Sequence, residues 1–219
     1  GLALTIALAQ GGMSVAVVDQ VPAATLESVP FDGRTTAVAL GPKRMLEALG
    51  LWEDFVPDAC PIQDIRVSDG PSRLYLHFDH REVGDQPFGW IVENRMLRIR
   101  LREAVEAYPN IAVFQPAAVV DSHTHELGHT VELDDGRTLI ADLVAAADGK
   151  FSPLRKAKKI KVRAKAYDQS AITFMARHEK PHRNIAHERF LSPGPLALLP
   201  MLGTEDEAWG GPNRSSVVW

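Results

Sequence analysis

Apolar residues at the start of the chain follow the pattern of a helix and then of a buried strand. Residues 2–8 are small or apolar apart from one threonine and contain neither proline nor charge, which predicts a helix packed closely on a sheet. Gly11 and Gly12 end it, because glycine reaches the left-handed cap conformation without a Cβ penalty. Residues 13–18 then form an almost wholly apolar strand, typical of a parallel sheet covered on both faces, which ends at Asp19.

Helical patterns return twice further along. Residues 20–30 are polar and contain proline, which predicts a connection. A helix over residues 43–49 follows Pro42 and is capped by Gly50. Residues 52–56 predict a short helix whose Trp52, Phe55 and Val56 pack on the core. Apolar residues at spacing four predict another helix over about residues 95–107.

Short apolar or alternating runs, bounded by Gly, Pro and Asp, predict many strands. Asp69-Gly70-Pro71 is typical of a turn, and Asp134-Asp135-Gly136 is a strong hairpin signal. The strand-like segments are residues 62–67, 73–78, 111–114, 118–123, 130–133, 138–147, 171–176, 186–191, 196–199 and 215–219. The order of elements indicates an α/β chain (α+β overall) in which pieces of one domain interrupt another.

Composition narrows the class of protein. The 219 residues allow one large or two small domains, and 24 basic against 28 acidic side chains, a net charge of −4, do not suggest a general nucleic-acid binder. No apolar run has the length of a membrane span, and no secretory signal is visible. Cys60 is the sole cysteine, which excludes an intrachain disulfide and a cysteine zinc site and fits a reducing compartment. Next to Pro61, it fits a small buried residue better than a nucleophile.

Residues 1–19 have the spacing of the second half of a nucleotide-binding βαβ unit. Asp19 lies eighteen positions after Gly1, close to the roughly 20 residues that separate the glycine fingerprint from the acid that binds a ribose. Such a helix start presents free N–H groups to a pyrophosphate. Gly1 matches only the last glycine of G-x-G-x-x-G, so an ordinary αβ unit without a ligand is an equal alternative. The missing initiator Met leads us to expect a truncated chain.

A second candidate motif is Asp148-Gly149-Lys150-Phe151-Ser152-Pro153-Leu154-Arg155, which follows the small apolar run 143–147. That run predicts a strand whose carboxyl end could face a nucleotide. Glycine after the acid lets a backbone approach a cofactor, Ser152 can cap a helix, and Arg155 supplies positive charge. The alternative is a strand, turn and capped helix without a ligand.

Other candidate sites are weaker. The basic stretch 155–165 fits a solvated face, and we do not expect nucleic acid there. His123 and His125 could share one strand face and bind a metal. However, these two residues and His129 flank a hairpin tip, where polar residues are simply solvated, so no metal site is predicted. No G-x-S-x-G elbow supports a hydrolase.

Together these motifs resemble the class A FAD-dependent aromatic hydroxylases, which include p-hydroxybenzoate hydroxylase. Asp32-Gly33-Arg34 resembles the family's D-x-R segment and Val92-Glu93-Asn94 its V-E-N segment. Residues 186–191, 194–200 and 215–219 are similar to the ubiquinone-biosynthesis branch, the UbiH/UbiF-like 2-polyprenylphenol hydroxylases. The resemblance covers essentially the whole chain. The family's later G-D motif would lie beyond Trp219, so we expect truncation at both ends and weaker FAD binding by this chain.

The resemblance implies a glutathione-reductase-like FAD-binding fold with an inserted β-sheet substrate domain. The FAD-binding domain would comprise residues 1–61 and 92–165, and the substrate domain residues 62–91 and 166–219.

The resemblance also implies which residues hold the cofactor. Gly1 would belong to the pyrophosphate turn and Asp19 would bind the adenosine ribose, where Glu is commoner in the family. Arg155 would assist with the pyrophosphate or the reductant.

Nearer the reacting ring, the same resemblance implies four further cofactor residues. Arg34 and Asn94 would line the flavin. Asp148 and Gly149 would lie where FAD and the reduced nicotinamide, NAD(P)H, approach one another. No protein side chain is predicted to be a nucleophile, so we name no catalytic residue.

The activity implied is that of a flavin-dependent monooxygenase, which transfers one atom of molecular oxygen to a ring carbon of a phenol. Residues 196–201 contain no Ser, Arg or Tyr to hold a carboxylate, which favours a polyprenylated phenol over a free benzoate, with Leu198 and Pro200 as substrate-binding candidates. A prenyl reductase, a halogenase and a non-enzymatic prenyl-lipid-binding relative remain alternatives. We expect a cytoplasmic protein, and peripheral contact with the inner membrane or with ubiquinone-biosynthesis proteins stays open.

Overall fold

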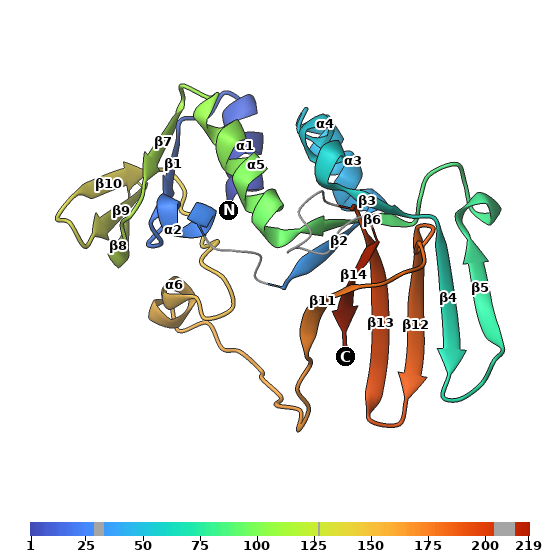
Figure 1. Cartoon of the computed structure of the whole chain (residues 1–219). Coiled ribbons are helices and arrows are strands. Elements are labelled where there is room, and N and C mark those ends of the chain that lie inside the picture. The colour runs from blue at the N-terminus through green and yellow to red at the C-terminus, as the bar shows by residue number, and fades with distance from the viewer. Residues whose placement is uncertain (29–32, 127, 204–212) are drawn as a thin grey trace. The chain divides into compact units, whose positions relative to one another are not determined.

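The computed structural model describes residues 1–28, 33–126, 128–203 and 213–219 of the chain (Figure 1). The chain divides into two compact units, one of Gly1–Ser28 with Arg102–Asp168 and the other of Val29–Leu101 with Gln169–Trp219. Asp32 of the D-x-R segment lies outside the described residues. No helix in the described part of the chain has the length and hydrophobicity needed to cross a bilayer. The functional division into FAD-binding and substrate domains stays a prediction.

The first unit begins with the predicted helix and strand. Helix α1 (Leu2–Gln10) ends with the amide of Met13 donating to the carbonyl of Leu8, at 3.1 Å. Gly12 supplies the left-handed turn that this closure needs, with φ +80°. Strand β1 (Val15–Val18) then pairs in parallel with β7 (Ile111–Phe114). The predicted order of helix, glycine cap and strand is confirmed.

Asn110 joins the end of α1 to this parallel strand pair. Its side-chain amide donates to the carbonyls of Ala9, at 2.9 Å, and Met13, at 2.8 Å. Because Asn110 directly precedes β7, these bonds fix where the helix end lies relative to the strand. Ile6 and Ala9 are buried, so the helix turns this side toward the interior of its unit.

A three-stranded antiparallel sheet also belongs to the first unit. Its strands β8 (Val119–His125), β9 (Gly128–Leu133) and β10 (Thr138–Ala141) pair in the order β10-β9-β8. The predicted hairpin at Asp134-Asp135-Gly136 is confirmed, because the amide of Leu133 donates to the carbonyl of Arg137 at 2.9 Å. Val131 and Leu133 are buried in its apolar cluster.

Two expectations for this unit are wrong. The predicted connection 20–30 contains helix α2 (Ala23–Ser28). The predicted strand 138–147 ends at Ala141, and residues 143–147 form no strand. Their small apolar composition fits a strand, but a strand needs a hydrogen-bonded neighbour, and these residues pair with no described strand. Leu143 is 78% exposed.

The second unit is built on two sheets. The smaller has the order β2-β6-β3, with β2 (Thr35–Ala39), β6 (Gly89–Glu93) and β3 (Cys60–Ile62) all antiparallel. The larger has the order β11-β14-β13-β12-β4-β5, visible across Figure 1, and only the β12–β4 pair is parallel. The strands of the larger sheet are β4 (Asp64–Asp69), β5 (Tyr75–Asp79), β11 (Thr173–Arg177), β12 (Ile185–Leu191), β13 (Gly194–Met201) and β14 (Arg214–Val218).

The helices of the second unit largely follow the sequence prediction. The helix predicted before Gly50 is present but begins earlier than expected. In the short helical stretch that follows, Trp52 and Phe55 are buried as predicted. Val56 is 47% exposed, so its predicted position in the core is wrong. The helical segments that complete the two units are α3 (Leu40–Ala48), α4 (Trp52–Phe55), the short helices η1 (Val56–Asp58) and η2 (His80–Glu82), α5 (Asn94–Glu106) and α6 (Pro153–Ala157).

A buried ion pair joins the two sheets of the second unit. The guanidinium of Arg214 on β14 donates to the carboxylate of Glu93 on β6 at 2.8 Å and to the carbonyl of Leu202 at 2.6 Å. Arg214 is 8% exposed. Nearby, the hydroxyl of Thr35 donates to that of Ser216 at 2.9 Å. The polar contacts lie beside an apolar cluster whose buried members are Ile62, Ile91, Ala186 and Met201.

Replacing Glu93 by glutamine should lower the free energy of unfolding by about 3 kcal/mol, because the buried Arg214 charge loses this carboxylate. Chemical denaturation measures the loss. The control is Glu132→Gln, which removes an exposed strand carboxylate on β9 and should cost less than about 0.5 kcal/mol. Equal losses in the two variants would show that the ion pair adds nothing to stability.

Candidate functional site

Two of the predicted cofactor-binding residues, Gly1 and Asp19, lie at the carboxyl end of the parallel strand pair, which we call the strand edge. Helix α1 runs antiparallel to β1, so its first residue and the last residue of β1 lie at the same edge (Figure 1). Gly1 precedes the helix and has no side chain to cap it, and the first helical bond runs from the Thr5 amide to the Gly1 carbonyl at 3.0 Å. The amides of residues 2–4 therefore remain available to a ligand.

Asp19 follows β1 and is exposed at this edge. Its amide donates to Phe114 at the end of β7, 3.1 Å away, and its carbonyl accepts from Ala117 at 2.9 Å. One carboxylate oxygen, Oδ1, accepts from the Val21 amide at 2.9 Å. The other carboxylate oxygen makes no hydrogen bond within the described residues. The carboxylate is thus held in one orientation by the turn and keeps an acceptor for a ligand.

Residues 143–147, which were wrongly predicted to form a strand, lie close to the start of α1. A Cβ built on Gly1 would lie 3.9 Å from the Cβ of Ala147. Asp148 is the next residue along the chain, so this contact brings the second motif to the first within the same unit. Asp148 therefore lies near the start of α1 although residues 143–147 form no strand.

The Asp148 motif forms a turn held by its own hydrogen bonds. Asp148 accepts from the amide of Leu154 at 3.2 Å, and Ser152 caps α6 by accepting from the Arg155 amide at 3.0 Å. Arg155 donates to the carbonyl of Lys150 at 2.6 Å. Gly149 has φ +82°, which explains the glycine without any ligand.

Asp148 is negatively charged at neutral pH. Burial works to raise the pKa of this carboxyl, but hydrogen bonds from Ser152 and the Leu154 amide, together with the charge of Arg155, bring the pKa below its ordinary value. The carboxylate can therefore accept hydrogen bonds but cannot donate one. This limits Asp148 to binding donor groups, such as sugar hydroxyls or an amide.

Arg34 and Asn94 lie together in the second unit. The register of β2 and β6 pairs Thr35 with Glu93, and one residue beyond it the Asn94 amide donates to the Arg34 carbonyl at 3.1 Å. The Thr36 hydroxyl donates to Oδ1 of Asn94 at 2.6 Å. Sequence reasoning missed Thr36, because its contact with Asn94 follows from the strand register and from no local motif.

Leu198 and Pro200 share one face of the large sheet. They alternate with Leu199 and Met201, which pack on the apolar cluster of the opposite face. Leu198 is half-buried and Pro200 is fully buried. Leu198 pairs with His187 on β12, so these two side chains are neighbours on the same face. His187 was not predicted, since only the register of β12 and β13 places it there.

Comparisons with known proteins decide the family. A model of the FAD binding domain family matches residues 1–209. The chain belongs to this family. It is 39% identical over 219 residues to the ubiquinone hydroxylase UbiL of Rhodospirillum rubrum, covering all of this chain and 49% of that protein. It is 29% identical over 221 residues to the 3-demethoxyubiquinol 3-hydroxylase of Escherichia coli, covering all of this chain and 54% of that protein.

The fold expectation is confirmed by a solved structure. A probable FAD-dependent monooxygenase from Pseudomonas aeruginosa, PqsL, superposes with a TM-score of 0.81 at 19% identity, over 99% of this chain and 56% of that one. The chain spans about half the length of the curated relatives it matches. The expected family resemblance and FAD as its cofactor are thus confirmed, whereas the individual cofactor-binding residues stay predictions.

The residues of the first unit fit the nucleotide part of FAD. The unbonded amides at the start of α1 are donors of the kind that hold a pyrophosphate. The remaining oxygen of Asp19 is an acceptor of the kind that binds ribose hydroxyls. Donors for an anion and an acceptor for a diol at the carboxyl end of one strand match the diphosphate and the ribose of an adenosine diphosphate group. This FAD binding domain therefore carries suitable chemistry at the predicted place.

Cys60 is a buried core residue, as expected. Its side chain is 1% exposed, and burial raises the pKa of the thiol to about 12, against the opposing effect of the Arg214 charge. A thiol with such a pKa is not a nucleophile at neutral pH.

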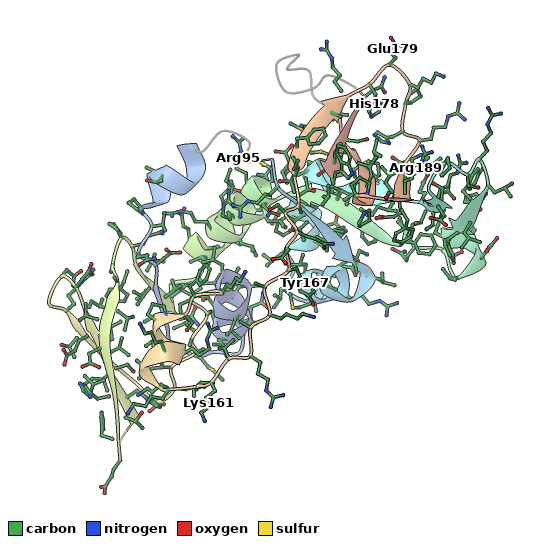
Figure 2. The ribbon with its side chains drawn as sticks, turned by 90° about the horizontal axis from the view of Figure 1, so that it is seen from below. Arg95, Lys161, Tyr167, His178, Glu179 and Arg189 are labelled. Carbon is green, nitrogen blue, oxygen red and sulfur yellow. The ribbon has the colours of Figure 1, made fainter. Side chains whose placement is uncertain are left out.

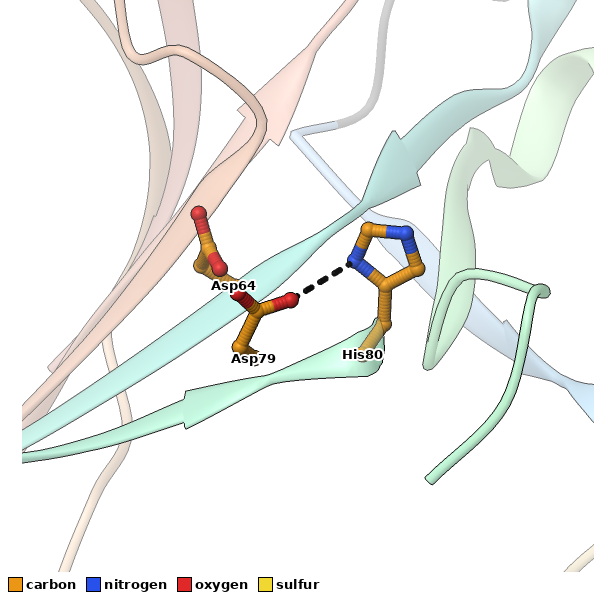
Figure 3. Close-up of side chains that lie close together, drawn as sticks. All are labelled: Asp64, Asp79 and His80. Atoms are coloured by element: carbon orange, nitrogen blue, oxygen red, sulfur yellow. Dashed lines mark ion pairs between the residues drawn. The ribbon is translucent and has the colours of Figure 1, made fainter. Parts of the chain in front are cut away.

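The three histidines of the β8–β9 hairpin do not gather. His123 pairs with Asp121 at 3.1 Å, and His125 and His129 contact threonine hydroxyls. Within the described residues, the ligand atoms of Asp64, Asp79 and His80 do lie within 4.8 Å of one another (Figure 3). However, Arg81 donates to both oxygens of Asp79 and holds the pKa of that carboxyl well below its usual range. An arginine thus already fills the cation's role there.

Proposed function

We propose that this chain is the FAD-binding part of a monooxygenase that hydroxylates the ring of a polyprenylated phenol. The match of residues 1–209 to the FAD binding domain family supports the cofactor. The observation that carries the proposal is the strand edge where the open start of α1 and the oriented carboxylate of Asp19 lie together. Relatives described as ubiquinone hydroxylases support the substrate class.

The first unit would hold the nucleotide. The amides following Gly1 would donate to the pyrophosphate, and Asp19 would accept from the ribose. Asp148 stays ionised and would accept from a hydroxyl or amide of FAD or NAD(P)H, while Gly149 leaves its side of the turn open, since a Cβ there would meet nothing within 4 Å. Arg155 lies on the same turn and would offset phosphate charge.

The second unit would hold the flavin and the substrate. Asn94 has one side-chain oxygen engaged by Thr36, which fixes the direction of its amide group, and Arg34 lies beside it. Leu198 and Pro200 would form the apolar wall against the substrate. No polar group at these two positions would satisfy a buried carboxylate, so a hydrocarbon substituent fits them better.

Bound FAD supplies the redox chemistry with molecular oxygen. With two electrons from NAD(P)H, this chemistry would allow one oxygen atom to enter a ring C–H bond as a hydroxyl group and the other to leave as water. The residues of the chain bind and orient the two cofactors, and the apolar wall excludes water from the ring. Contact with a membrane surface or with ubiquinone-biosynthesis proteins would bring the long-tailed substrate to the enzyme.

Changing Asp19 tests the nucleotide assignment. Asp19→Asn keeps an oxygen for the Val21 amide but replaces the ligand-facing acceptor with a donor. FAD binding by the purified protein should weaken by roughly 1–3 kcal/mol, the cost of an unpaired polar partner. Flavin fluorescence during titration with FAD gives the affinity, and the melting temperature without FAD should stay the same.

Asp142→Asn is the matched control, because Asp142 is exposed in the same unit and outside the proposed site. Its affinity for FAD should equal that of the parent. Equal affinity in Asp19→Asn as well would reassign Asp19 to an ordinary strand end.

The length of the hydrocarbon tail tests the substrate assignment. Affinity should rise with each added prenyl group until the apolar wall is covered, by about 0.8 kcal/mol per methylene removed from water. Leu198→Asp should abolish this gain. The measurement is turnover of phenols that differ only in tail length, with detection of the hydroxylated product.

Leu196→Ile conserves the apolar volume of the same strand and serves as the control. It should keep the dependence on tail length. Equal turnover of tailless and long-tailed phenols by the parent would refute the lipid substrate and leave the flavin assignment intact. Flavin reduction without any hydroxylated product would favour a prenyl reductase.

A further inference from the structure

Residues 150–167 combine positive charge with exposed apolar side chains, and we call them the basic segment. They contain eight Lys or Arg residues and no Asp or Glu, in a chain with a net charge of −4. After α6 ends, the chain carries no helix or strand until β11. All residues from 156 to 167 are exposed, and Lys161 and Tyr167 mark the segment in Figure 2.

Only some of these charges are used within the unit. Arg155 donates to the Lys150 carbonyl, and Lys158 donates to the Ser122 carbonyl at 3.0 Å. These bonds anchor the first half of the basic segment. Lys161 and Arg163 make no hydrogen bond or ion pair within the described residues, so their charges face solvent.

The exposed apolar side chains are interleaved with the charges. Ile160 is 61% exposed and Val162 is 60% exposed, and they alternate with Lys161 and Arg163. In an extended chain such alternation places cations on one side and apolar groups on the other. Two aromatic rings are also exposed, Phe151 at 86% and Tyr167 at 69%, each beside a lysine ammonium group.

We propose that the basic segment docks on a surface of anionic lipid headgroups. The cations complement the negative charge of such a surface, and long Lys and Arg side chains reach headgroups while their neighbours enter the apolar layer. Ile160 and Val162 gain from leaving water only if the partner has an apolar layer below its charges. A nucleic-acid backbone offers the charge without that layer, so the alternation favours lipid. The inference does not rest on the flavin assignment.

Vesicle binding tests the proposal without any measurement of activity. The probe is a vesicle of equimolar phosphatidylcholine and phosphatidylglycerol, compared with a pure phosphatidylcholine vesicle. The chain should sediment with the anionic vesicles and not with the neutral ones. Replacing Lys161, Arg163 and Lys165 by glutamine should lower the partition coefficient at least about ten-fold, since each cation near an anionic surface contributes about five-fold.

The matched control removes the same charge elsewhere. Arg44, Arg73 and Lys180 are exposed residues of the other unit, and their replacement by glutamine should change the partition coefficient by less than about two-fold. Circular dichroism of both triple variants should match that of the parent, because all six side chains face solvent. An equal loss in both variants would show that only net charge matters and would overturn the docking site.

The apolar contribution has a test of its own. Ile160→Ser with Val162→Ser should reduce the binding that persists in high salt, where the charges are screened. Ile140→Ser with Leu143→Ser is the control, because both side chains are 78% exposed and lie outside the basic segment. Equal loss in both pairs would overturn apolar insertion. Failure of the parent to bind anionic vesicles, with segment-dependent binding to double-stranded DNA, would replace the lipid surface with a nucleic acid.

Discussion

The buried ion pair between Arg214 and Glu93 is the contact on which the second unit depends. It ties the last residue of β6 to the first residue of β14, so it joins the small sheet to the large one. Asn94, which would orient the flavin, directly follows Glu93, and β13, which carries the proposed substrate wall, pairs with β14. Loss of the pair would therefore disturb the proposed cofactor and substrate residues together, although neither partner is proposed to touch a ligand.

Elements that depend on neighbouring residues in the sequence were predicted correctly. The helix, glycine cap and strand over residues 2–18 follow from periodicity and from the left-handed conformation that Gly12 adopts, and the Asp134 hairpin follows from its turn residues. The strand predicted over residues 143–147 is not formed. Its small apolar composition indicates burial, but a strand also needs a hydrogen-bonded neighbour, which composition does not reveal. The Glu93–Arg214 pair could not be predicted, since 121 residues separate its members.

In the candidate site, too, the sequence identified individual residues, whereas their contacts became visible only in the structure. The sequence pointed to Asp19, but only the structure shows that one carboxylate oxygen accepts from the Val21 amide, while the other makes no hydrogen bond within the described residues. The sequence also pointed to the Asp148 motif. The Asp148 carboxylate accepts hydrogen bonds from Ser152 and from the Leu154 amide, so it stabilises this turn whether or not a ligand binds. Thr36 and His187 were not predicted. The strand register places Thr36 beside Asn94 and His187 beside Leu198, and no local sequence motif indicates either contact.

Binding of FAD is the central claim, and the visible spectrum of the purified protein tests it most directly. We expect flavin absorbance that co-purifies with the chain or appears on addition of FAD. We also expect the flavin to be released into the filtrate when the protein is denatured, because none of the residues proposed to bind FAD in the described part of the chain is a His or Cys. A protein that stays colourless in the presence of excess FAD would contradict the account.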